Sequence, residues 1–423
     1  MSGMKWLPAF LLLPLLFSCA QAGESYAPHV PEEGKKDWTA FVCSDPHYLS
    51  SSLHDDGEAF HLVYEESGDG KMAPYSDTLF DCFVEEALRA KPDAVLLLGD
   101  LTFNGETRSH QEVAEGCKRL LEAGIQPLII PGNHDIDQYY SYSYSGDSVK
   151  KIPSPTYSEF REIYFPYGLQ QSFSRMEKSF SYAYQASEDL VLLALDGSPE
   201  KHYEIGEAGL SFAEEVLKQA KERNQKVLPF SHRSALVHHP NFTDGYALAD
   251  HEALSNLYKE YGVTLSLAGH WHIQHIQEEA GYSELLTGPL CALENSYGIL
   301  SFEKGEFSYH KKSLDMASYA ARHQLSDPVY SDFRKASYAL FDSMSRRSSS
   351  DERRPAEIPA EDYAILRESF VHFNRSYFLG EPVDLSLYEE EMTLWNRYES
   401  WRRSQYMEPV FLSLEKDHRI YPQ

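Results

Sequence analysis

Short apolar runs alternate with amphipathic stretches along the chain from Trp38 to about Phe307. The runs have the length of buried β-strands, and the stretches between them carry apolar residues at the three- and four-residue spacing of helices. This alternation predicts an α/β domain. We expect strands over residues 39–44, 94–98, 127–130, 180–184, 190–195, 226–230, 264–267, 283–287 and 298–302, and helices over residues 77–90, 106–123, 207–222 and 250–261.

The strand pattern stops after about Tyr309. Four small helices, which favour an all-α bundle, are predicted over residues 313–323, 329–344, 360–373 and 385–403. The segment 345–359 is rich in Ser, Arg, Glu and Pro and is expected to form a mobile loop. The chain is therefore predicted to contain an α/β domain over residues 38–308 and a C-terminal helical domain over residues 309–423.

Residues 1–22 have the features of an export signal. Lys5 provides a short positive start, the apolar run Trp6–Phe17 follows, and small residues come next. The run is too short to span a bilayer. A buried N-terminal helix is disfavoured because Pro8 and Pro14 interrupt the run.

Two processing sites compete at the end of this signal. Leu16-Phe17-Ser18-Cys19 resembles a bacterial lipobox with lipidated Cys19, although Phe17 replaces the usual small residue, whereas Ala20-Gln21-Ala22 fits an ordinary signal-peptidase site. We favour the lipobox, because Cys19 ends the apolar run and the hydrophilic residues 23–37 could serve as a tether. We therefore expect a lipid-anchored protein on the outer side of a bacterial membrane, with a secreted or periplasmic protein as the alternative.

Composition and charge narrow the range of partners. Of the 423 residues, 42% are hydrophobic and 24% charged, as in ordinary globular proteins. The formal net charge of -27 would repel a long polyanion, so bulk nucleic acid is not an expected partner. An anionic substrate would need local positive charge, which a bound metal cluster can supply.

The four cysteines beyond the export signal are Cys43, Cys82, Cys117 and Cys291. They form no C-x-x-C pair, so neither a zinc ribbon nor a redox motif is supported. Their apolar surroundings favour buried free thiols, and disulfides stay open as the alternative in an exported protein.

Side chains that can bind metals follow several of the predicted strands. Asp45 and His47 come after the first strand, and their i, i+2 spacing sends both side chains to one face of an extended chain. Asp100 follows strand 94–98, which would deliver its carboxylate to the edge where open α/β sheets bind ligands. Taken alone, a D-x-H pattern arises by chance, and Asp100 could equally cap a helix.

Later strands repeat the arrangement. Asn133-His134-Asp135 follows strand 127–130, His232 follows strand 226–230, and His270-Trp271-His272 follows strand 264–267. One such histidine could be structural. Five strand ends with metal-capable side chains in one domain instead predict a metal-dependent site.

In order, these motifs are D-x-H, G-D, G-N-H-[DE], a single His and G-H-x-H, and they resemble those of the calcineurin-like metallophosphoesterase family over about residues 40–302. The resemblance implies a β-sandwich flanked by helices. Within the family, the chain is most similar to exported bacterial cyclic-nucleotide phosphodiesterases with a C-terminal helical bundle. That closer similarity rests on the helical tail and on residues 57–59, 68–71, 75–77 and 99–106.

The resemblance implies a site for two divalent metal ions bridged by Asp100. One ion would be held by Asp45, His47, Asp100 and His272, and the other by Asp100, Asn133, His232 and His270. Mixed carboxylate, imidazole and amide ligands favour Mn, Fe or Zn. Two divalent ions with two aspartates and a bridging hydroxide leave a net charge of about +1, which offsets a phosphodiester monoanion.

It also implies roles for the neighbouring side chains. His134 would face the substrate and give a proton to the leaving alkoxide, and Asp135 would favour the charged imidazolium. Arg233, Asn104 and the ligand Asn133 are candidates for substrate contacts. The alternatives are a surface salt bridge for Arg233 and a turn at Asn104-Gly105.

The leading hypothesis is hydrolysis of a small phosphodiester, such as a cyclic nucleotide, by a metal-bridging hydroxide with His134 as the acid. The alternatives are a phosphomonoesterase or glycerophosphodiesterase on the same site, and an inactive scaffold that acts as a binding lipoprotein. The complete set of ligands counts against the scaffold. The tyrosine-rich stretch 139–144 could stack a nucleobase or simply pack its own loop.

Overall fold

The computed structural model describes residues 25–55, 57–66, 70–197 and 203–422. The predicted export signal with its lipobox at Cys19, and the first two residues of the predicted tether, lie outside the described residues. Within these ranges, no helix combines the length and the hydropathy that a membrane span requires.

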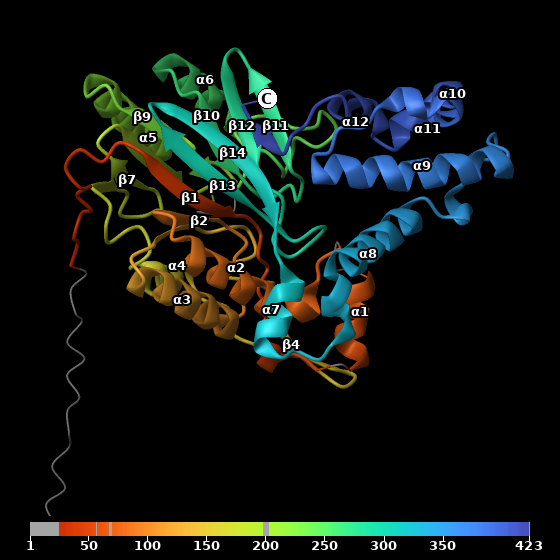
Figure 1. Ribbon diagram of the computed structural model, residues 1–423, viewed down its shortest axis with the longest axis horizontal. Coiled ribbons are helices and arrows are strands. Elements are labelled where there is room, and N and C mark those ends of the chain that lie inside the picture. The colour runs from red at the N-terminus through yellow and green to blue at the C-terminus, as the bar shows by residue number, and fades with distance from the viewer. Residues whose placement is uncertain (1–24, 56, 67–69, 198–202, 423) are drawn as a thin grey trace, which may run out of the picture.

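Two mixed β-sheets form the centre of the fold (Figure 1). The first has six strands in the order β15-β14-β13-β1-β2-β3, and the second has seven in the order β11-β12-β10-β9-β8-β7-β6. Strands β1 to β3 are parallel to one another, as are β8, β9, β10 and β12. The strands are β1 (Trp38–Cys43), β2 (Ala94–Leu98), β3 (Gln126–Ile130), β6 (Ser174–Arg175), β7 (Tyr182–Ser187), β8 (Leu190–Leu195), β9 (Lys226–Ser231), β10 (Leu265–Ala268), β11 (His275–Glu279), β12 (Tyr282–Leu286), β13 (Ser296–Glu303), β14 (Glu306–Ser313) and β15 (Ile420–Tyr421).

Side chains of the parallel strands are buried on both faces of each sheet. In β8, Leu192 and Ala194 belong to the core between the sheets, whereas Val191 and Leu193 pack with residues of helices on the other face. This division follows from the alternation of side chains along an extended chain. The predicted sandwich flanked by helices is confirmed. The flanking helices are α2 (Ser76–Ala90), α3 (Thr107–Glu122) and α4 (Tyr157–Tyr164) on the first sheet and α5 (Gly206–Glu222) and α6 (His251–Tyr261) on the second (Figure 1).

Several elements were not predicted from the sequence. Besides α4, they include helix α1 (Glu58–Glu66), the hairpin of β4 (Tyr142–Ser145) and β5 (Ser148–Lys151), and the edge strands β6, β11 and β15. Strand β14 was not predicted either, and it crosses the predicted domain boundary at residues 308 and 309.

The C-terminal helical region packs on the α/β domain in two places. Near α2, Met316 and Phe333 share a cluster with Leu79. Farther along the chain, a second cluster around the fully buried Trp395 includes Trp271 of the α/β domain. The helices of this region are α7 (Met316–His323), α8 (Phe333–Ser348), α9 (Ala360–Leu379), α10 (Glu389–Arg397), α11 (Glu399–Ser404) and α12 (Met407–Ser413).

The last part of the chain returns to the first sheet, where β15 pairs antiparallel with β14. The segment 345–359, predicted as a loop, first continues α8 to Ser348. Tyr363 then fastens it, because its hydroxyl donates to the carbonyls of Ser349 and Ser350 at 3.1 and 3.3 Å. The helical region is therefore joined to the sheet sandwich at both of its ends.

Residues 25–37 of the predicted tether lie against the α/β domain. The backbone amides of Ala27 and His29 donate to the carbonyls of Gln170 and Gln171, each at 2.8 Å. The guanidinium carbon of Arg175 lies 3.1 Å from the ring centroid of Tyr26. Most of this segment is thus part of the folded surface.

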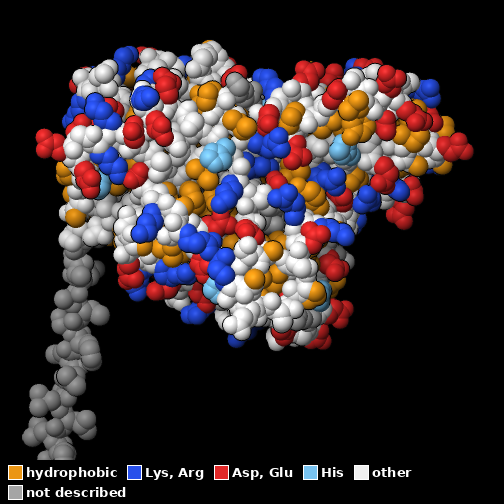
Figure 2. Space-filling view, in the orientation of Figure 1, with side chains coloured by type: hydrophobic (Ala, Val, Ile, Leu, Met, Phe, Trp, Pro, Cys, Tyr) orange, Lys and Arg blue, Asp and Glu red, His pale blue; other side chains and the backbone are white. Residues whose placement is uncertain are grey.

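All four described cysteines are free and buried, which confirms the predicted free thiols. Acidic side chains gather over the far end of the C-terminal helices, where α10 begins with three glutamates (Figure 2). Lys and Arg side chains are more frequent near the middle of the same face.

Candidate metal centre

The predicted ligands lie at the carboxyl ends of neighbouring parallel strands. Asp45 and His47 follow β1, Asp100 follows β2, and His232 follows β9. The remaining ligands, Asn133, His270 and His272, follow β3 and β10. Strand ends from both sheets therefore supply one site, as expected where ligands bind at the carboxyl edge of α/β sheets.

The backbone at this site is strained. Asp45, His47, Asp100, His270 and His272 all have positive φ angles, between 40° and 68°. Such left-handed conformations are unfavourable for residues with a Cβ atom, and they concentrate at functional sites. Tight turns after the strands thus aim the side chains inwards instead of letting the strands continue.

Gly132 permits the closest approach of two of these turns. A Cβ atom at this position would lie 2.1 Å from the backbone nitrogen of Asp100 and 2.2 Å from its Oδ1. No side chain fits at such distances. The turn after β3 can therefore approach Asp100 only with glycine at this position.

The first group of ligands consists of Asp45, His47, Asp100 and His272, whose ligand atoms all lie within 4.8 Å of one another. Nε2 of His47 lies 3.1 Å from Nε2 of His272 and 3.6 Å from Oδ2 of Asp100. Burial, together with the Lys71 ammonium, holds the pKa of His47 well below its ordinary value. A neutral imidazole among buried carboxylates is the form that binds a metal ion.

Asp100, His232 and His270 form the second group. Nδ1 of His232 donates to the carbonyl of Leu98 at 2.8 Å, which leaves Nε2 for a metal ion. This Nε2 lies 3.3 Å from Oδ1 of Asp100 and 3.1 Å from Oδ1 of Asn133. The predicted amide ligand therefore joins the group.

Asp100 is the one residue that both groups share. Burial would raise the pKa of its carboxyl, but His232 and His134 lower it well below the ordinary value. The pKa of His232 is lowered by burial but raised overall to about 9 by Asp100. The carboxylate is thus ionised and placed to bridge two metal ions.

His134 lies beside the first group of ligands. Its ring meets that of His47 edge to face, with the centroids 4.9 Å apart. Its Nδ1 lies 2.9 Å from the carbonyl oxygen of Phe103 and 2.9 Å from Oδ1 of Asn104. Because these oxygens can only accept, Nδ1 carries a proton and Nε2 faces the other way. Asn104, a predicted candidate for a substrate contact, thus helps to orient the His134 ring.

The interpretation of Asp135 as the partner of His134 is wrong. The Asp135 carboxylate is fully buried and accepts hydrogen bonds from the backbone amides of Leu101, Thr102 and Gly132, at 2.8 to 3.1 Å. The carboxylate that raises the pKa of His134 is Asp100, although burial lowers that pKa overall. A tight turn sends the side chains of neighbouring residues in different directions, so Asp135 holds two loops together.

Two buried residues near His134 were not singled out as functional candidates from the sequence. Lys71 is 5% exposed, and its ammonium lies 5.9 Å from the ring centroid of Phe103. Glu106 is fully buried and accepts from the backbone amide of Asn104 at 3.0 Å, and burial raises its pKa to about 7. Both residues lie in segments, 68–71 and 99–106, on which the similarity to exported cyclic-nucleotide phosphodiesterases rests. That similarity is the only sequence signal that could have found them.

The tyrosine-rich stretch is divided between two environments. Tyr144 is buried in a small cluster with Phe60 and Phe103, so it packs its own loop. Tyr139 and Tyr140 are 66% and 63% exposed, with their rings edge to face at 5.3 Å. Tyr142 is partly buried, so Tyr139 and Tyr140 are the rings of this stretch that are most accessible to a ligand.

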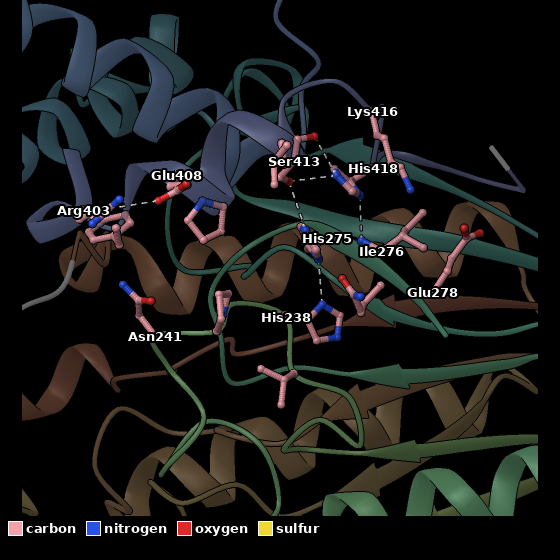
Figure 3. A pocket seen from close by; sticks show the side chains of 16 residues that line it. His238, Asn241, His275, Ile276, Glu278, Arg403, Glu408, Ser413, Lys416 and His418 are labelled. Atoms are coloured by element: carbon pink, nitrogen blue, oxygen red, sulfur yellow. Dashed lines mark hydrogen bonds and ion pairs between the residues drawn. The ribbon is translucent and has the colours of Figure 1, made fainter. Parts of the chain in front are cut away.

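A cavity of about 780 Å³ lies between helix α12 and strand β11 (Figure 3). A chain of hydrogen bonds crosses its wall: Nδ1 of His238 lies 2.8 Å from Nδ1 of His275, whose Nε2 is 3.1 Å from the hydroxyl of Ser413. That hydroxyl is 3.0 Å from Nε2 of His418. These histidines, which the motifs did not include, join the C-terminal region to the α/β domain.

The wall of this cavity should be sensitive to acid. Burial lowers the pKa of His418 to about 4 in the folded chain, whereas an exposed histidine has a pKa of about 6.5. Between these two pH values the imidazole is protonated in the unfolded chain but neutral in the folded chain, so acid favours unfolding. Stability from this group is complete at pH 7.5 and lost as the pH falls, by roughly 2 kcal/mol at pH 5. Urea unfolding of the wild type and of His418→Gln at pH 7.5 and pH 5 measures this loss of stability.

The wild type should lose more stability between pH 7.5 and pH 5 than His418→Gln does. His310→Gln, at an exposed position on β14, is the control and should keep the wild-type pH dependence. Equal pH dependence in wild type and His418→Gln would contradict the expected effect.

The fold and the two ligand groups define a metal-dependent phosphoesterase with a dimetal centre. The family model described as calcineurin-like phosphoesterase matches residues 39–274, more than half of the chain. The chain therefore belongs to the calcineurin-like phosphoesterase family. No curated protein sequence matches it significantly.

Three solved structures are among those similar to this chain. A dimetal phosphatase from Danio rerio has 16% sequence identity and a TM-score of 0.46, and the match covers 65% of this chain and 95% of that one. GAP50, the anchor in the inner membrane complex of Plasmodium, has 10% identity and a TM-score of 0.41, with coverage of 66% and 85%. A protein of Thermus thermophilus has 13% identity and a TM-score of 0.39, with coverage of 66% and 100%.

Proposed function

We propose that the protein is an exported phosphodiesterase that hydrolyses a small phosphodiester, with a cyclic nucleotide as the preferred substrate class. The observation that carries the proposal is the position of His134 beside the first group of ligands. The Phe103 carbonyl holds Nδ1 of His134, and Nε2 is turned away from that carbonyl. Nε2 is the atom that would protonate the leaving alkoxide.

Two divalent ions, when bound, supply a hydroxide nucleophile at neutral pH and positive charge against the phosphoryl oxygens. The chain supplies the rest. The Asp100 carboxylate accepts from the backbone amide of His134 at 2.8 Å, so the bridging ligand and the acid are positioned together. The carboxylate, imidazole and amide ligands favour Mn, Fe or Zn.

The preference for a diester rests on charge. The two ligand aspartates and a hydroxide would leave about +1 on the centre, which matches a monoanion. The cyclic-nucleotide class rests on the sequence similarity described above, and the exposed rings of Tyr139 and Tyr140 could stack a base. Export and anchoring through Cys19 rest on the sequence of residues 1–22 alone.

A phosphomonoesterase is the second candidate, because Arg233 adds a buried positive charge beside the second ligand group. A centre with this extra charge would better match a monoester dianion. A phosphodiesterase and a phosphomonoesterase therefore differ in whether they prefer a diester or a monoester substrate, which can be measured.

We expect the purified protein with Mn²⁺ to hydrolyse bis-p-nitrophenyl phosphate faster than p-nitrophenyl phosphate, and EDTA to abolish both activities. A panel of 3′,5′- and 2′,3′-cyclic nucleotides would then identify the substrate. Faster turnover of the monoester would favour the phosphomonoesterase, and no turnover with any divalent metal would favour a binding scaffold.

A further inference from the structure

Arg233 lies directly against the second ligand group. Its side chain is 6% exposed, and its Nη2 donates to Oδ1 of Asn133 at 3.2 Å. Its Nη1 lies 2.9 Å from Nε2 of His270. The guanidinium therefore contacts two of the four side chains that would hold the second metal ion.

The contact with His270 excludes a metal ion on the same imidazole. Nη1 can only donate, so the hydrogen bond requires a lone pair on Nε2. A metal ion bound through Nε2 would use that lone pair. A metal ion bound through Nδ1 would leave the proton on Nε2, which would then donate to the Gly245 carbonyl at 2.9 Å. Arg233 must leave His270 in either case.

Asn133 presents a similar conflict. Its Oδ1 accepts from Arg233 and also lies 3.1 Å from Nε2 of His232. The same oxygen is the atom that an amide offers to a metal ion. A permanent positive charge at this distance also repels a divalent cation.

In the first ligand group the nearby cation is the Lys71 ammonium, which helps to lower the pKa of His47 below its ordinary value. In the described part of the chain, no arginine contacts the side chains of Asp45, His47 or His272. The two halves of the centre are therefore chemically unequal, although they share Asp100.

In the same position the guanidinium also packs on the ring of Tyr203. Its central carbon lies 4.0 Å from the ring centroid, so a cation–π contact with this ring can hold the side chain when its hydrogen bonds to the ligands break. The charge would then remain beside the site, where it can meet a phosphoryl oxygen.

We propose that Arg233 is a built-in competitor for the second metal ion, so that the centre fills in two steps and the second ion binds only by displacing the guanidinium. This inference rests on the dinuclear centre of the proposed function. It concerns metal binding alone, so its test needs no substrate.

The test is titration of the metal-free full chain with Mn²⁺ by isothermal calorimetry. The wild type should bind one ion tightly and a second ion at least about tenfold more weakly. Arg233→Met keeps an unbranched side chain that cannot donate a hydrogen bond, and it should tighten the second step at least about tenfold with little change in the first. Arg375→Gln, which removes an arginine paired with Asp342 among the C-terminal helices, is the control.

Two further variants and a spectroscopic measurement complete the test. Arg233→Met combined with Asn133→Ala should lose the second step, which assigns that step to the second ligand group. Arg233→Ala replaces the Met variant if the latter does not fold. Electron paramagnetic resonance of the wild type should show isolated Mn²⁺ up to one equivalent and a spin-coupled pair only above it.

The inference is overturned if the wild type fills both positions with equal affinity, or if the Arg233 variants leave the second dissociation constant unchanged. A tightened second step in a protein without diesterase activity would instead support the competitor and contradict the proposed function.

Discussion

Replacing Asp100 with Asn should lower kcat for bis-p-nitrophenyl phosphate by about three orders of magnitude and reduce the bound Mn²⁺ from two ions to at most one. Asp100 belongs to both ligand groups, so the change removes the bridging charge from both halves of the centre. Charge stabilisation by metal ions is worth several kcal/mol, and each 1.36 kcal/mol is about a tenfold change in rate. Steady-state kinetics and elemental analysis of the dialysed protein measure the two effects.

Asp196→Asn is the matched control for this variant. Asp196 follows β8 as Asp100 follows β2, and it is also buried. Its carboxylate, however, accepts from the Phe180 amide at 3.0 Å and from the Tyr157 hydroxyl. We expect the control to retain both metal ions. Full metal content in Asp100→Asn, or an equal loss of metal in Asp196→Asn, would contradict the assignment of Asp100 as the bridging ligand.

Replacing His134 with Ala should lower the rate for cyclic nucleotides by about two to four orders of magnitude, the range typical of a lost general acid. The loss for bis-p-nitrophenyl phosphate should be much smaller, because p-nitrophenolate leaves without a proton. Metal content should not change, since the described contacts of the His134 ring are to Phe103, Asn104 and the edge of His47. Kinetics with both substrate types and elemental analysis are the measurements.

His310→Gln replaces an exposed histidine on β14 and is the control for the loss of a histidine elsewhere in the chain. It should match the wild type in both rates and in metal content. An equal loss for good and poor leaving groups would contradict the acid assignment. A fall in metal content with His134→Ala would show instead that His134 supports the ligands.

The ligands themselves were predictable because a simple rule connects sequence to position. Polar residues that directly follow apolar parallel strands meet at one edge of the sheet, so Asp45, Asp100 and His232 could be grouped before their contacts were known. The buried parallel strands were equally clear, since both of their faces are covered and their sequences are almost uniformly apolar.

Strands at or next to the edges of the sheets were harder to predict. In β14, buried and exposed residues alternate, and the exposed side includes His310 and Ser308. In β11, the sequence ends with Gln277-Glu278-Glu279, which lacks the apolar signal of a strand. Such strands are stabilised by pairing with a neighbour, and a local pattern carries no information about that neighbour.

Side-chain direction and long-range contacts were the other limits. The sequence places Asp135 next to His134, but only the turn geometry shows that its carboxylate meets the amides of Leu101 and Thr102. The contact of His275 with His418 joins residues that are 143 positions apart in the sequence, at a ring distance of 4.2 Å. No periodicity could reveal such a pair.

The attachment of residues 25–37 to the domain surface sets the length of the proposed membrane anchor. Tyr26 is held by Arg175, and the next contacts follow at Ala27 and His29. From Cys19 to Tyr26 an extended chain spans at most about 25 Å. A lipid on Cys19 would thus keep the attachment point at Tyr26 within roughly one bilayer thickness of the membrane surface. The proposed anchor would therefore leave the folded domain little freedom to move away from the lipid.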